Sequence, residues 1–132
     1  MQNGKWSVAL SSNADLSASA GLCVTSAGTI ATDPTLDTTV GPLEQNAATT
    51  ANGELVFATL GGTTTCIVGI GGLAPYVNVM VAAGGTVITH VGALGNHALG
   101  RFAPELIDGA LPPNAVAGDE VTVHIYAAQP IW

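Results

Sequence analysis

The stretch AGDEVTVHIYA, Ala117–Ala127, decides the fold class because apolar and polar side chains alternate along it. The alternating positions are Val121, Val123 and Ile125 on one side and Thr122, His124 and Tyr126 on the other. Successive side chains of a β-strand point to opposite faces, so this pattern predicts a strand with one buried and one half-exposed face. Asp119 and Glu120 follow a glycine and precede the strand, so we interpret them as a solvent-exposed turn and not as an acid/base pair.

Further strands are expected over most of the chain. Alternation recurs at Trp6–Leu10 and Val77–Val81, whereas three runs are apolar or threonine-rich on both faces: Leu55–Leu60, Thr63–Ile70 and Thr86–Val91. Runs of the second kind are typical of strands covered on both sides. Pairs of glycines separate the later strands at hairpin spacing. We therefore predict an all-β fold, a small antiparallel barrel or sandwich.

Helix is expected to be scarce. The best candidate follows Phe102, where Pro104 suits the first position of a helix and Gly109 suits its end. The segment is long enough for a single turn only.

A chain of 132 residues, of which 48% are hydrophobic, is the size of one domain. Residues 1–50 contain mainly Ala, Ser, Thr, Asp and Gly, with few large apolar side chains. This composition predicts an extended N-terminal arm and loops packed on the same domain, with residues 51–132 forming the core.

The charge balance excludes several classes of partner. Two basic residues against nine acidic ones give a net charge of -7, which would repel a nucleic acid. The uncharged stretch between Glu54 and Arg101 is interrupted by paired glycines, which argues against a membrane span. The N-terminus lacks the apolar core of a secretory signal, so synthesis in the cytosol is expected. Only 8% of residues are charged, which is typical of a chain covered by neighbouring subunits.

No motif supports catalysis, a cofactor or a metal. His90, His97 and His124 have no spacing that a metal-ligand pattern requires. The serines lack a nucleophile-elbow motif, and the glycine-rich segments lack the lysine of a phosphate-binding loop. Cys23 and Cys66 lie among apolar residues and are expected to be buried free thiols, with a disulfide between them as the open alternative.

The segment VAAGGTVITHVGALGNHALGRFAPELIDGALPPNAVAGDEVTVHIY resembles the small capsid decoration, or cement, proteins of tailed bacteriophages. Three elements carry the resemblance: the glycine-rich strand at Ala83–Thr86, the segment Gly95–Arg101 and the closing strand Ala117–Ile125. The resemblance covers roughly residues 54–132. Residues 1 to about 50 have no counterpart in the compact members, and the loop before the last strand is longer than usual.

The resemblance implies a β-tulip-like barrel that lies on the outer surface of the phage head, commonly as a homotrimer, and bridges neighbouring major capsid protein subunits. The chain would be made in the host cytoplasm and would have no enzymatic activity. Aromatic and apolar residues are the expected interface anchors. These candidates are Trp6, Val8, Phe102, Tyr126, Ile131 and Trp132.

Two other functions stay open at the level of sequence. One is a carbohydrate- or host-surface-binding β module of a phage tail or fibre, although two tryptophans and two tyrosines offer few aromatic groups for it. The other is a small cupin-like metalloenzyme that uses His90, His97 and His124.

Overall fold

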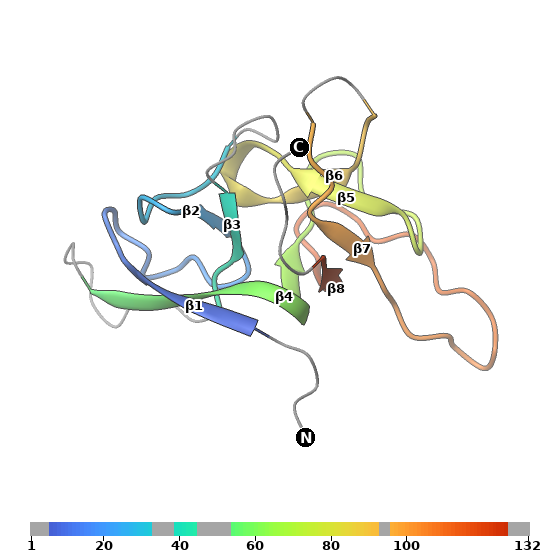
Figure 1. Cartoon of the computed structure of the whole chain (residues 1–132). Coiled ribbons are helices and arrows are strands. Elements are labelled where there is room, and N and C mark those ends of the chain that lie inside the picture. The colour runs from blue at the N-terminus through green and yellow to red at the C-terminus, as the bar shows by residue number, and fades with distance from the viewer. Residues whose placement is uncertain (1–5, 33–38, 45–53, 93–95, 127–132) are drawn as a thin grey trace.

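The structure is a computed structural model of the chain, and it describes residues 6–32, 39–44, 54–92 and 96–126 (Figure 1). These residues form eight strands, and the all-β prediction is confirmed. The strands are β1 (Trp6–Ser11), β2 (Cys23–Thr25), β3 (Thr39–Pro42), β4 (Leu55–Ile67), β5 (Asn78–Val81), β6 (Val87–Thr89), β7 (Gly100–Phe102) and β8 (Glu120–Ile125). One short 3₁₀ helix, η1 (Ala83–Gly85), connects β5 to β6.

Six strands form one antiparallel sheet in the order β1-β4-β8-β7-β5-β6, and β2 and β3 form a small second sheet. The large sheet curls so that β6, at its far edge, approaches the residue that directly follows β4. Val68, directly after β4, forms an isolated parallel bridge with Val87 of β6. The bridge is a single contact, so the sheet approaches a barrel without closing into one.

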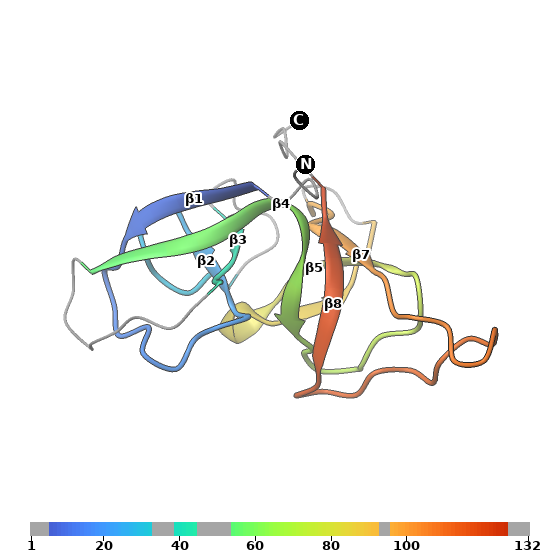
Figure 2. The ribbon, with the colours of Figure 1, turned by 90° about the horizontal axis from the view of Figure 1, so that it is seen from below.

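The long strand β4 belongs to both halves of the molecule (Figure 2). Its first part pairs with β1 and its second part with β8. Two strands separated by Gly61 and Gly62 were predicted here, but the structure has one continuous strand of 13 residues. Gly62 has a φ of 94°, which a residue with a side chain rarely adopts, so the glycine pair redirects the strand without ending it.

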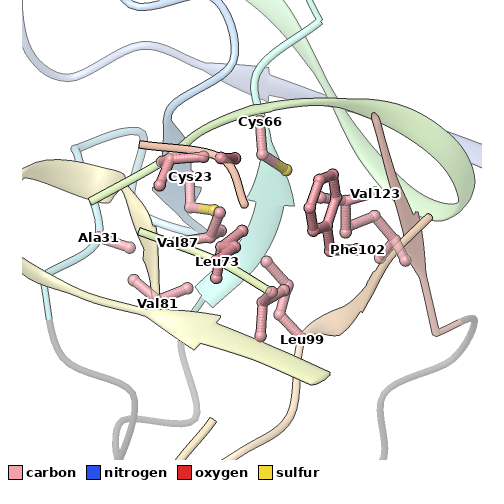
Figure 3. Packing of buried hydrophobic residues seen from close by; sticks show 13 residues of the cluster. Cys23, Ala31, Cys66, Leu73, Val81, Val87, Leu99, Phe102 and Val123 are labelled. Carbon is pink, nitrogen blue, oxygen red and sulfur yellow. The ribbon is translucent and has the colours of Figure 1, made fainter. Parts of the chain in front are cut away.

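Two hydrophobic clusters lie on either side of this change in direction. The larger cluster fills the curled part of the sheet, and side chains from β4, β5, β6, β7 and β8 meet there (Figure 3). Its buried members include Cys66, Val87, Phe102, Val123 and Ile125. The alternation predicted for the last strand is therefore confirmed, because Val123 and Ile125 are buried while Thr122 and His124 are exposed.

The smaller cluster is built largely by the N-terminal third of the chain. Leu16, Val24 and Leu43 are almost completely buried against Val56 and Ala58 of β4. Residues 6–32 and 39–44 therefore fold onto the sheet, which differs from the predicted extended arm. Composition suggested an arm because large apolar residues are rare there, but the few that are present meet at one place.

The single helical turn predicted after Phe102 is wrong. Asp108 and Gly109 have φ values of 50° and 78°, and Ile107 and Ala110 exchange two backbone hydrogen bonds of 2.9 Å. This is a tight hairpin turn in which both central residues have positive φ, for which Asp-Gly is a favoured pair. In the part of the chain that the structure describes, no helix has the length and apolar character to cross a bilayer.

Candidate interaction surfaces

Several exposed apolar residues lie along β1 and the first part of β4. Trp6 is 51% exposed and Leu55 is 58% exposed, and Phe57 and Leu60 are exposed to a lesser degree. We call these four residues the strand patch. Leu55 and Phe57 are two positions apart and share the outer face of the sheet, because the intervening Val56 points into the smaller cluster.

A second exposed apolar surface lies on the long loop between β7 and β8, which projects from the side of the sheet (Figure 1). Leu106, Ile107 and Leu111 are each more than half exposed, and they flank the tight turn at Asp108 and Gly109. We call these three apolar residues the hairpin tip. The two backbone hydrogen bonds between Ile107 and Ala110 hold the turn in one conformation, so a partner would bind it with little loss of backbone entropy.

The structure places the six predicted interface anchors in different environments. Trp6 is exposed, and Tyr126 is half-buried beside β8. Val8 is half-buried and packs against the smaller cluster, so it points inward. Phe102 is only 4% exposed and belongs to the larger cluster, so its prediction as an interface anchor is wrong. Ile131 and Trp132 lie outside the described residues.

Sequence reasoning missed the hairpin tip and most of the strand patch. The signal for the tip was the pair Asp108-Gly109 between apolar residues, which is a strong hairpin signal. The exposure of Phe57 carried no comparable signal, because LVFATL is apolar on both faces.

The polar face of the curled sheet carries a network of aromatic and polar side chains. Arg101 Nε donates a hydrogen bond of 2.9 Å to the carbonyl oxygen of Tyr76, and the Arg101 guanidinium lies 5.8 Å from the centre of the Tyr76 ring. Tyr126 donates its hydroxyl proton to Asn78, and its ring meets His124 edge to face. A sugar ring would need to displace Arg101 to stack on that side of Tyr76, which gives the carbohydrate-binding alternative little support.

An open polar cavity of about 400 Å³ lies between the N-terminal part of the chain and the outer face of β4 and β8. It is lined by Ala20, Gly21, Leu43, Glu44, Thr63, Thr64, Thr65, Glu120 and Thr122. Glu44 accepts hydrogen bonds from the hydroxyls of Ser7 and Thr59, so this carboxylate of the cavity lining is already held by the protein. The hydroxyls and carboxylates of this lining could bind a polar group.

The three histidines do not form a metal site. His90 lies after β6, with Nε2 at 3.4 Å from the carbonyl oxygen of Asn96, whereas His124 lies within β8 opposite Thr63. Across residues 6–32, 39–44, 54–92 and 96–126, no three His, Cys, Asp or Glu side chains gather as metal ligands would. The metalloenzyme alternative therefore has no geometric support.

Both cysteines are buried and free, as predicted. Cys23 comes from β2 and Cys66 from β4, and both belong to the larger cluster (Figure 3). Burial raises the pKa of Cys23 to about 12. Burial also raises the pKa of Cys66 well above its ordinary value, and the neighbouring Cys23 contributes to that shift. A thiol held in its neutral form is a poor nucleophile, so these groups are structural.

We expect the free energy of unfolding to decrease as the pH rises above about 9. The unfolded chain ionises its thiols near pH 8.5–9, whereas the folded chain keeps Cys23 neutral up to about 12. A pKa that is raised on folding gives stability that is complete below the unfolded value and is lost between the two values. Urea unfolding between pH 7 and 11 measures this. The variant Cys23→Ser/Cys66→Ser is the control, and an equal pH dependence in it would contradict the assignment.

Comparison of the chain with protein-family models, with curated proteins and with solved structures found no match.

Proposed function

We propose that the chain is a non-enzymatic structural protein of a phage virion. It binds the outer surface of the head, contacts neighbouring major capsid protein subunits, and stabilises the shell against the pressure of the packaged DNA. The sequence resemblance supplies the phage context, including the expectation of a trimer and of synthesis in the host cytoplasm.

The observation that carries the proposal is a pair of exposed apolar surfaces on a chain with few charges. The hairpin tip and the strand patch expose large apolar side chains, while only 8% of all residues are charged. Monomers rarely expose contiguous apolar surfaces without a partner. Contacts of this kind depend little on salt, and many copies on one shell would add avidity.

The hairpin tip is the better candidate for the capsid contact. It extends beyond the sheet on a loop that is held by backbone hydrogen bonds, so it can enter a groove between two capsid subunits. Glu105 and Asp108 are exposed beside the apolar residues and would form the polar rim of such a contact.

We expect the double variant Leu106→Asp/Ile107→Asp to bind heads at least tenfold more weakly than the wild type, because two carboxylates would have to lose water in the contact. The measurement is sedimentation of the purified chain with undecorated heads from the phage that encodes it. Val91→Asp places a single carboxylate on an exposed valine outside both surfaces and is expected to bind normally. Failure of the wild type to bind heads would exclude the proposed function, and normal binding by the double variant would exclude the tip.

A further inference from the structure

The carboxylates of Glu105 and Asp108, beside the hairpin tip, are not used by the fold. Both side chains are exposed, and among the described residues neither has a hydrogen-bond or ion-pair partner. Three other carboxylates accept hydrogen bonds from the protein itself: those of Asp15, Glu44 and Asp119. Two unpaired charges therefore lie three positions apart, around the apolar side chains of the tip.

The turn does not require the charge of Asp108. Asp108 and Gly109 have φ values of 50° and 78°, and Asn-Gly is favoured in such a turn as Asp-Gly is. An asparagine would therefore give the same backbone conformation without a charge. The carboxylate at this position needs a reason other than the turn.

The apolar side chains of the tip lie on both strands of the hairpin. Leu106, Ile107 and Leu111 are each more than half exposed. Ile107 forms an antiparallel bridge with Ala110, so Leu106 and Leu111 are the next pair of positions across the hairpin. Successive side chains of an extended segment point to opposite sides, so Leu106 and Ile107 face different sides. A flat surface would cover one side only, whereas a groove with two apolar walls would cover both.

The charges of Glu105 and Asp108 select a basic partner. Moving a carboxylate out of water into an apolar contact is costly unless a cation or hydrogen-bond donors replace the water. The net charge of -7 also attracts a positive surface. A second copy of the chain offers no such surface, because it has two basic residues against nine acidic ones. One of the two, Arg101, already bonds to the carbonyl oxygen of Tyr76 and lies against its ring.

We propose that the hairpin tip binds a groove with apolar walls and with lysine or arginine side chains at its rim, which pair with Glu105 and Asp108. This assignment rests on the proposed function, in which the groove belongs to the phage head, and it adds the chemistry of the partner surface. The apolar part of the contact depends little on salt, whereas the charged pairs weaken as the salt concentration rises.

The test is sedimentation of the chain with undecorated heads, from physiological salt to about 1 M salt, where the screening length falls to about 3 Å. The variant Glu105→Gln/Asp108→Asn keeps the size of both side chains and the turn, and it removes only the two charges. We expect it to bind about fivefold to tenfold more weakly than the wild type at physiological salt, as the loss of two ion pairs at an interface rim would cause. The difference is expected to disappear at about 1 M salt.

Two controls separate a local effect from an effect of net charge or folding. Asp15→Asn/Glu120→Gln removes the same number of carboxylates away from the tip, and it is expected to bind as the wild type does. The thermal unfolding midpoint of Glu105→Gln/Asp108→Asn should equal that of the wild type. If the midpoint falls, Glu105→Gln alone decides, because Glu105 lies outside the turn.

The outcomes distinguish this proposal from the proposed function. Equal binding of the wild type and the tip variant at physiological salt would overturn the basic groove and leave capsid binding intact. An equal loss of binding in the Asp15→Asn/Glu120→Gln control would overturn it as well, because the effect would then come from net charge. Failure of the wild type to bind heads would overturn both.

Discussion

Replacing Phe102 with alanine is expected to lower the free energy of unfolding by about 3–5 kcal/mol, as removal of a buried phenylalanine does in other cores. Phe102 is 4% exposed and lies in the larger cluster, where its ring is close to Val123 (Figure 3). The side chains around Phe102 belong to neighbouring hydrogen-bonded strands, so the structure cannot collapse fully into the cavity that the substitution leaves. Urea unfolding followed by tryptophan fluorescence measures the change.

Phe57→Ala is the matched control, because Phe57 is 40% exposed on the strand patch. Its substitution is expected to cost about 1 kcal/mol, because part of the Phe57 ring is already exposed to water in the folded chain and its removal loses less buried apolar surface. The effect on partner binding is expected to be the reverse. Phe57 lies on the strand patch, one of the two surfaces on which the proposed function rests, and Phe102 does not. Equal losses of stability in the two variants would contradict the assignment of Phe102 to the core.

Replacing Gly28 with alanine is the second substitution expected to have a large effect, a loss of about 3 kcal/mol of unfolding free energy. Gly28 has a φ of +81°, and an added Cβ would lie 2.1 Å from the carbonyl oxygen of Ser11 and 2.9 Å from the amide nitrogen of Asn13. The same place holds the 2.9 Å hydrogen bond from the amide of Asn13 to the carbonyl oxygen of Gly28. The backbone would have to move, and the end of β1 would separate from the turn that precedes Thr29.

Gly84→Ala separates the effect of contact from the effect of backbone strain. Gly84 has a similar φ of +76°, but an added Cβ there would have no atom within 4 Å. We expect a loss of about 1 kcal/mol from the left-handed conformation alone. Thermal unfolding of both variants would show a clear difference in midpoint. The same midpoint in both would mean that the N-terminal segment does not pack on β1 and behaves as an arm after all.

Short-range patterns in the sequence were sufficient to place some of the strands, but they did not predict β2, β3 or β7. Alternation predicted the strands at Trp6, at Val77 and at Val121, and the structure has β1, β5 and β8 there, because the two-residue period of a strand is a local property. The low proportion of charged residues, 8%, likewise led to the prediction of a surface covered by partners, which stays a prediction. These conclusions need no knowledge of which strands are neighbours.

Only the tertiary structure decided which side chains are available to a partner. Phe102 and Phe57 both lie in apolar surroundings in the sequence, yet one is buried by β8 and the other lies on the outer face of the sheet beside β1. The N-terminal third contains too few apolar residues to predict a core, but Leu16, Val24 and Leu43 meet over β4 from distant positions in the chain. Burial depends on contacts between residues far apart in sequence, which no local pattern determines.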